Sequence, residues 1–183
     1  MSTIDHARKF VWIHVPKTAG NSIETGLRLQ AKGHKTAKRL VVRTLRCNPA
    51  YFAAAFVRHP ADRLWSAYNA LVQHRRTWAF VEECGSWDVF VDRLPGAYRQ
   101  LIHTHPMVHF LTMGGRVLVH FVGRFERLEE DYRRLCGILE EPVRPLPHIN
   151  RSKHGPWQKA YTPGQLRRIE KLYQADYEVF GYA

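Results

Sequence analysis

The chain has 183 residues, of which 45% are hydrophobic and 24% are charged, and its net charge is +12. This length suits a single domain over residues 1–183, and no apolar run is long enough to cross a bilayer, so we expect no membrane span within these residues. With no secretory segment visible, we expect a cytoplasmic chain or the catalytic domain of a longer one. Three scattered cysteines argue against a disulfide framework and a structural zinc site. The positive charge favours either nucleic-acid binding or an enzyme with a strongly anionic cofactor.

Apolar periodicity and turn residues predict alternating strands and helices. In chain order they are a strand at Phe10–Val15, helices at Asn21–Lys32 and Thr36–Arg46, a strand at Tyr51–Val57, helices at Ala61–His74 and Ser86–Leu94, an irregular stretch at Gly96–Gly115, a strand at Val117–Val122, a helix at Leu128–Leu139, a Pro-rich loop at Glu140–Tyr161 and a helix at Pro163–Tyr173. This order predicts parallel strands joined by right-handed crossovers. The fold class we expect is α/β, a P-loop-like three-layer α/β/α arrangement with a central parallel sheet.

The segment Pro16–Ser22 joins the first predicted strand to the first predicted helix. Backbone N–H groups in such a loop point outward, the helix dipole favours negative charge, and Lys17 adds a full positive charge. The P-loop of nucleoside triphosphatases places its lysine after the second glycine, whereas Lys17 precedes Gly20. The segment therefore predicts binding of a nucleotide or another phosphoester, with a chemistry different from that of the P-loop.

A second anion site is predicted where Arg58 ends the second strand. Ser66 lies about two turns into the following helix. Because ligands of open parallel sheets bind at the carboxyl ends of the strands, Arg58 and Ser66 could grip one anion from two sides. The alternative is that Arg58 pairs with Asp62 while Ser66 faces solvent. Gly123–Glu126 follows the third strand at the same predicted edge.

Two motifs resemble those of sulfotransferases that use 3′-phosphoadenosine 5′-phosphosulfate (PAPS): P-K-T-A-G-N-S over residues 16–22 and F-V-R-H-P-A-D-R-L-W-S-A-Y over residues 56–68. Weaker similarity follows in F-V-G-R-F-E-R-L-E-E-D over residues 121–131 and L-P-H-I-N-R-S over residues 146–152. The resemblance covers nearly the whole chain, in order. It is closest to the carbohydrate branch, which includes the heparan and dermatan 2-O-sulfotransferases and the chondroitin and HNK-1 sulfotransferases.

The resemblance implies a role for each matching residue. Lys17 would contact the oxygen that bridges phosphate and sulfate and would stabilise the leaving phosphate, and Arg58 and Ser66 would hold the 3′-phosphate. The residues implied to hold the 5′-phosphate are Thr18, Ala19, Gly20, Asn21 and Ser22. A late loop that closes over the nucleotide would contribute Arg151, Ser152 and Lys153. Relatives more often carry Thr at position 21, and those of the Golgi have a membrane anchor that this sequence lacks.

Sulfuryl transfer resembles phosphoryl transfer, in which the protein mainly positions groups and neutralises charge. Lys17 would serve the leaving phosphate, and a histidine or glutamate would accept the proton of the attacking hydroxyl. His34 is the first candidate for this base because related carbohydrate enzymes place theirs before the second strand; His105 is the second, and Glu24 ranks below both. His14 would orient the loop, and no metal site is predicted.

The sequence thus predicts a sulfotransferase that moves the sulfuryl group of PAPS to an acceptor hydroxyl by in-line displacement, leaving 3′-phosphoadenosine 5′-phosphate (PAP). The expected acceptor is a saccharide or glycoconjugate, and no nucleic-acid partner is expected. Two alternatives stay open at this stage. A nucleotide-dependent kinase or phosphotransferase would need a Mg²⁺-binding carboxylate at a strand end, and a polyanion-binding protein without activity would bind DNA or RNA with strong salt dependence.

Overall fold

The computed structural model describes residues 2–30, 33–73, 79–98, 100–147, 149 and 155–182. The chain forms two compact units, each made of two stretches: a first unit of Met1–Arg58 with Met107–Ile149, and a second unit of His59–Pro106 with Asn150–Ala183. The expectation of one domain over residues 1–183 stays a prediction.

The first unit is built on a four-stranded sheet with the order β1-β2-β3-β6. Strands β2 (Phe10–Ile13), β3 (Phe52–Val57) and β6 (Phe121–Arg124) run parallel, with Ile13 opposite Ala55 and Val57 opposite Arg124. This confirms the predicted parallel core of the sheet. The edge strand β1 (Thr3–Asp5) pairs antiparallel with β2 and was not predicted.

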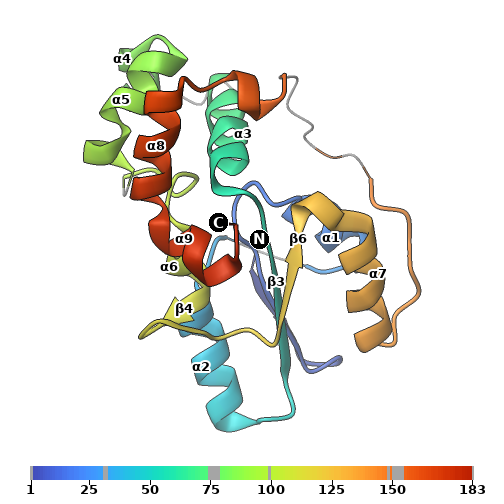
Figure 1. Ribbon diagram of the computed structural model, residues 1–183. Coiled ribbons are helices and arrows are strands. Elements are labelled where there is room, and N and C mark those ends of the chain that lie inside the picture. The colour runs from blue at the N-terminus through green and yellow to red at the C-terminus, as the bar shows by residue number, and fades with distance from the viewer. Residues whose placement is uncertain are drawn as a thin grey trace. The chain divides into compact units, whose positions relative to one another are not determined.

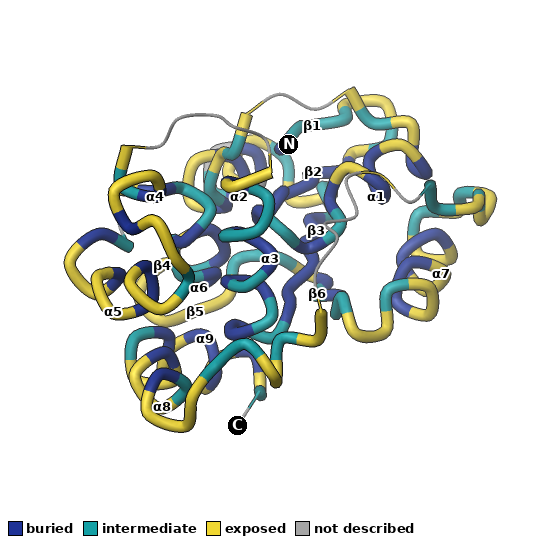
Figure 2. The backbone as a smooth tube through the Cα atoms, turned by 90° about the horizontal axis from the view of Figure 1, so that it is seen from above, coloured by how far each residue is buried: buried dark blue, intermediate teal, exposed yellow. Residues whose placement is uncertain are grey.

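Helices cover both faces of this sheet, so that the first unit has three layers. Strands β2 and β3 are apolar and buried almost throughout, as a sheet covered on both faces requires (Figure 2). Helices α1 (Gly20–Gly26) and α7 (Leu128–Ile138) lie on one face, where Ile23 and Leu135 pack against Phe56. Helices α2 (Ala37–Cys47) and α6 (Met107–Leu111) lie on the other face (Figure 1). The mostly parallel sheet flanked by helices confirms the α/β/α fold class.

Three predicted elements of the first unit differ from those observed. The first helix ends at Gly26 instead of continuing to Lys32, because Arg28 adopts a positive φ of 53° that a helix does not allow. The predicted strand Val117–Val122 is two elements: β5 (Arg116–Val117) pairs with β4 (Thr112–Met113), and only β6 joins the main sheet. Helix α6 and strand β4 occupy part of a stretch that was predicted to be irregular.

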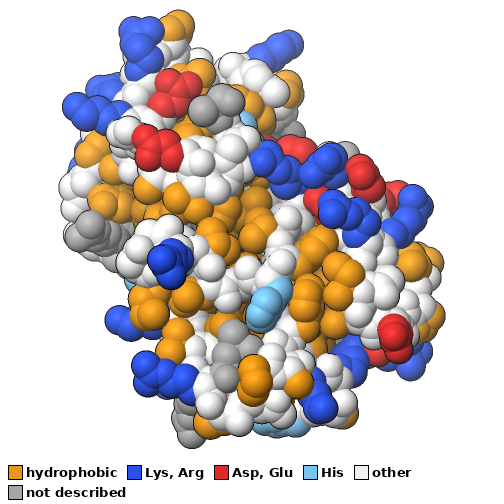
Figure 3. All heavy atoms as spheres, turned by 60° about the horizontal axis from the view of Figure 1, so that its bottom comes forward, with side chains coloured by type: hydrophobic (Ala, Val, Ile, Leu, Met, Phe, Trp, Pro, Cys, Tyr) orange, Lys and Arg blue, Asp and Glu red, His pale blue; other side chains and the backbone are white. Residues whose placement is uncertain are grey.

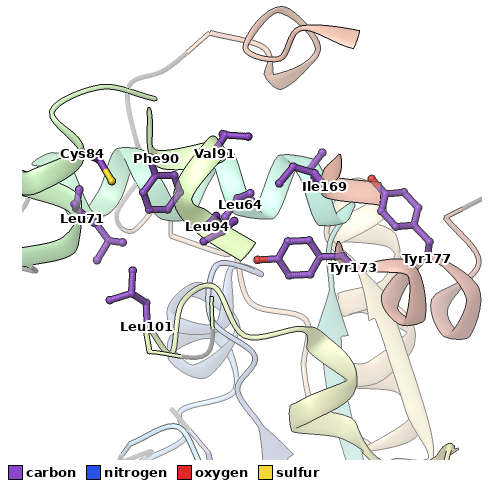
Figure 4. Close-up of a cluster of buried hydrophobic side chains, with 12 residues drawn as sticks. Leu64, Leu71, Cys84, Phe90, Val91, Leu94, Leu101, Ile169, Tyr173 and Tyr177 are labelled. Carbon is purple, nitrogen blue, oxygen red and sulfur yellow. The ribbon is translucent and has the colours of Figure 1, made fainter. Parts of the chain in front are cut away.

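The second unit is helical. It contains α3 (Pro60–Gln73), α4 (Ala79–Cys84), α5 (Trp87–Ala97), the 3₁₀ turn η2 (Trp157–Lys159), α8 (Pro163–Leu172) and α9 (Gln174–Phe180). Side-chain caps start two of these helices: Ser86 accepts from the Val89 N–H, and Thr162 forms a reciprocal capping box with Gln165. The core gathers Leu64 of α3, Phe90 and Leu94 of α5, Ile169 of α8 and Tyr173 (Figure 4). The short helices α4 and α9 were not predicted.

The chain has a net charge of +12. On the face drawn in Figure 3, several Lys and Arg side chains gather with Asp and Glu side chains on one side, and other Lys and Arg side chains are scattered over the rest of the face. Among the described residues, every helix is too short or too polar to span a membrane.

Candidate active site

A strained loop, Val15–Ala19, joins β2 to α1 in the first unit. Lys17 has φ 71° and Ala19, the N-cap of α1, has φ 63°. The left-handed region costs a residue with a Cβ atom about 1–2 kcal/mol, so such residues persist only where their surroundings enforce them. Strain of this kind gathers at functional sites, and here it falls on the predicted phosphate loop.

The loop is closed by hydrogen bonds of its own. The Thr18 hydroxyl donates to the Val15 carbonyl at 2.9 Å, and the N–H groups of Ser22 and Ile23 both donate to the Ala19 carbonyl, at 3.0 and 3.2 Å. A helix offers no acceptor to its first N–H groups, so those of Gly20 and Asn21 are directed at whatever precedes α1. A bound anion suits this position. The hydroxyl proton of Thr18 is donated to the Val15 carbonyl and cannot also be donated to a phosphate. Thr18 would therefore contact the 5′-phosphate through its backbone N–H.

Arg58 reaches the loop from the end of β3. Its Nη1 donates to the Lys17 carbonyl at 3.2 Å, and its guanidinium carbon lies 3.9 Å from the centroid of the Phe125 ring. Phe125 opens the 3₁₀ turn η1 (Phe125–Arg127) directly after β6, so the carboxyl ends of three strands meet here as expected for an open α/β sheet. Sequence reasoning left Phe125 without a role, because an aromatic residue after a strand is usually part of the core.

Two cations share the loop. Burial lowers the pKa of Lys17 to about 8, and the nearby Arg58 guanidinium lowers it further in the same direction. No carboxylate among the described residues lies within ion-pair distance of the Lys17 ammonium. A half-buried lysine beside a buried arginine places two like charges close together, and a bound anion would offset their repulsion.

Behind the loop lies a buried polar cluster. His14 Nδ1 and Glu24 Oε1 are 2.5 Å apart, and Trp12 Nε1 donates to the same Oε1 at 3.0 Å. The His14 ring touches Gly20, where a Cβ atom would lie 2.5–2.7 Å from three ring atoms. The sequence indicated that His14 orients the loop, whereas nothing in it indicated a bond between Trp12 and Glu24, because a tryptophan in an apolar strand normally belongs to the core.

His34 lies beside this cluster. Its ring meets the His14 ring edge-on with centroids 4.8 Å apart, and its Nδ1 lies 3.4 Å from the His14 carbonyl oxygen. Burial lowers the pKa of His34, and the His14 carbonyl opposes that shift. Of the two histidines predicted as bases, His34 lies in the same unit as Lys17, whereas His105 lies in the second unit.

The other predicted site residues lie elsewhere in the chain. Ser66 is 3% exposed and His105 is half-buried, both in the second unit, so the alternative of a solvent-facing Ser66 is wrong. The joint grip of Arg58 and Ser66 on one anion stays a prediction. Arg151, Ser152 and Lys153 lie outside the described residues.

Comparison with protein families agrees with this geometry. A family model described as "Sulfotransferase family" matches residues 1–183, the full length of the chain. Comparisons with curated proteins and with solved structures gave no significant match. Since the family match runs through the strand, the strained lysine loop and the arginine that meets it, the chain belongs to the sulfotransferase family and is a transferase of sulfuryl groups.

Proposed function

We propose that this sulfotransferase takes its sulfuryl group from PAPS and transfers it in line to a carbohydrate hydroxyl, with PAP as the second product. The observation that carries the proposal is the meeting of Lys17 and Arg58 at one loop, two partly or wholly buried cations that a doubly phosphorylated donor would neutralise. Family membership favours sulfuryl transfer over the kinase and polyanion-binding alternatives.

The donor would be held by its two phosphate groups. The N–H groups of the loop and of the start of α1, from Thr18 to Asn21, together with the Ser22 hydroxyl, suit the 5′-phosphate, and Lys17 suits the bridging oxygen on which charge develops as the sulfuryl group leaves. Arg58 would take the 3′-phosphate, and its stacking on Phe125 keeps the guanidinium plane fixed for a bidentate contact. The proposed donor site also includes Ser66, Arg151, Ser152 and Lys153 on the strength of the sequence resemblance alone.

Lys17 must carry its proton to act as this cation. With the pKa of Lys17 at about 8, the ammonium form prevails at neutral pH. Negative charge brought close to Lys17 favours the charged form and so raises that pKa. We therefore expect Lys17 to be fully protonated once the donor is bound.

His34 is the base that we propose for the acceptor hydroxyl. A base must be neutral when the hydroxyl arrives, and burial lowers the pKa of His34 in that direction. If its Nδ1–H donates to the His14 carbonyl, the Nε2 lone pair is the one that accepts the proton. His105 is the rival, and its backbone carbonyl accepts from Arg63 Nη2 at 2.6 Å in the second unit.

Calorimetric titration with PAP, alongside ADP and ATP, tests the donor. We expect micromolar PAP binding, weaker binding of ADP because it lacks the 3′-phosphate, and about 100-fold weaker PAP binding in Arg58→Ala. A preference for ATP with Mg²⁺, or no nucleotide binding at all, would overturn the proposal. The acceptor is tested by sulfate transfer from radiolabelled PAPS to heparan, chondroitin, dermatan and simple phenols, in which labelling of phenols alone would overturn the carbohydrate assignment.

A further inference from the structure

The Glu24 carboxylate accepts hydrogen bonds from two buried N–H groups, one on Trp12 in β2 and one on His14 directly after that strand. Trp12 Nε1 and His14 Nδ1 both point to Glu24 Oε1, at 3.0 and 2.5 Å, and all three residues are buried. We assign the proton to His14 Nδ1, because an ionised Glu24 then accepts from both rings at one oxygen. A carboxylate engaged in this way is satisfied by the protein itself.

These bonds bridge the loop from one side to the other. His14 directly precedes Val15, where the loop begins, and Glu24 lies in the second turn of α1, beyond the point where the loop ends. The His14 ring also fills the space in which a side chain on Gly20 would sit. These contacts fix α1 to the residue that follows β2, in addition to the hydrogen bonds that the loop residues make among themselves and with the first turn of α1.

The loop needs such support because it stores strain and charge. Lys17 and Ala19 both take left-handed φ angles, and Lys17 lies next to Arg58. Strained residues hold their conformation only when the surrounding structure over-determines it. His14 also contacts His34, through its backbone carbonyl and through its ring.

We infer that His14 and Glu24 are positioning residues, a buried brace that holds the Val15–Ala19 loop and His34 in the conformation that receives the donor. The inference rests on the proposed function, since it takes PAPS as the donor. It also gives Glu24 a task other than proton transfer, which removes it from the candidate bases.

Three variants separate a brace from a base. Glu24→Leu removes the acceptor and leaves two buried N–H groups unsatisfied. Glu24→Gln places an amide oxygen where Oε1 lies, so that both hydrogen bonds can persist without the charge. Thr25→Ala is the matched control, because Thr25 is the exposed neighbour of Glu24 on the same helix.

The readouts are the PAP dissociation constant and the kcat of PAP formation from PAPS. We expect Glu24→Leu to weaken PAP binding by about 10-fold or more and to lower kcat further, because Lys17 acts most strongly on the transition state. Glu24→Gln should recover most of both quantities, and Thr25→Ala should match wild type. Wild-type affinity and kcat in Glu24→Leu would overturn the inference. So would a Glu24→Gln that binds PAP normally but loses kcat as completely as Glu24→Leu, since that is the behaviour of a base.

Hydrogen exchange of the ligand-free protein keeps this test independent of the donor. The amides of Ser22 and Ile23 report on the start of α1, because both donate to the Ala19 carbonyl. Glu24→Leu should speed their exchange while the strands of the sheet stay protected, and unchanged exchange would overturn the inference. A wild-type protein that binds no PAP would defeat the proposed function, and the exchange result would still decide on the brace. Should Glu24→Leu fail to fold, His14→Phe, which keeps a ring against Gly20, carries the same expectations.

Discussion

Two buried arginines, one in each unit, show how differently the protein treats the same side chain. Arg63 in the second unit is 0% exposed, donates to the carbonyls of His103 and His105 at 3.1 and 2.6 Å, and lies 5.8 Å from the Tyr173 ring centroid. Arg58 in the first unit is 8% exposed, lies closely over Phe125 and shares its loop with the ammonium of Lys17.

The contrast teaches how to tell a binding cation from a structural one. The guanidinium of Arg63 is directed at neutral carbonyls that its own unit provides, and so it fixes the chain around His103–His105. Arg58 also donates to a carbonyl of its own unit, that of Lys17, but it places a second positive charge beside the Lys17 ammonium as well. A bound anion would offset the repulsion between these two charges, so we propose a ligand as a further partner of Arg58.

The largest effect should come from the other cation of the first unit. In Lys17→Ala, we expect kcat to fall by about 1,000-fold or more, because the charge that forms on the leaving phosphate loses its stabilising ammonium. PAP formation from PAPS with a heparan or chondroitin acceptor measures this, with Lys38→Ala, an exposed lysine on α2, as the control. A Lys17→Ala enzyme that keeps most of its activity would disprove the role of Lys17.

Arg58→Ala should separate binding from stability. We expect about 100-fold weaker PAP binding and little change in the affinity for ADP, which lacks the 3′-phosphate. The free energy of unfolding should fall by less than in Arg63→Ala, because the relieved repulsion with Lys17 offsets part of the lost bond to the Lys17 carbonyl and of the lost contact with Phe125. Calorimetry and urea unfolding check the two halves of this prediction, and equal losses for PAP and ADP would contradict the assignment of Arg58 to the 3′-phosphate.

Arg63→Ala should show the opposite pattern. The substitution leaves the carbonyls of His103 and His105 without their donor inside a packed unit, so we expect a loss of about 2–4 kcal/mol in the free energy of unfolding. Urea unfolding measures it beside Arg58→Ala. If the two variants lost equal stability, the distinction between a structural and a binding arginine would fail.

A smaller effect should appear in the protons exchanged when PAP binds. At about pH 8 the Lys17 side chain is near half protonation, and PAP should raise its pKa, so binding should take up about half a proton. The uptake is measured from the dependence of the calorimetric enthalpy on the ionisation enthalpy of the buffer. It should vanish below about pH 7, where Lys17 is already charged, and also in Lys17→Arg, because arginine never loses its proton.

The same shift has a consequence for stability, with a definite sign. The pKa of Lys17 is lowered from its ordinary 10.5 to about 8 in the folded chain, so the unfolded chain binds more protons between these two values. Stability from this group should therefore rise with pH across that window, and Lys17→Met should remove the rise. Urea unfolding of the two proteins over the same pH range checks the sign.

Local features of the fold were predictable because each rests on residues close in sequence. The apolar runs of β2 and β3 gave their positions, and the caps at Ser86 and Thr162 started helices where expected. Strand β1 was not predicted because it has only three residues, too few to show a periodic pattern. The first helix ends earlier than predicted because Arg28 adopts a left-handed conformation. Nothing in the residue type arginine indicates such a conformation in advance.

The candidate site was predictable in its residue types and less so in its contacts. Lys17 and Arg58 stood out because their motifs follow predicted strands. Phe125 beneath Arg58, and Trp12 beside Glu24, could not be inferred because each contact joins segments that are brought together only when the strands pair. Sequence reasoning also treated Arg58 and Arg63 as one motif, and only their different neighbours separate them.

By itself, the sequence determined the alternation of strands and helices, the phosphate-loop motif and the family, since these depend on local composition and spacing. Tertiary structure decided which groups are buried together: Lys17 with Arg58, and His14 with Glu24. Burial and proximity set the pKa of Lys17 and the strain of its loop, because desolvation and the Coulomb interaction depend on distances in space and not along the chain.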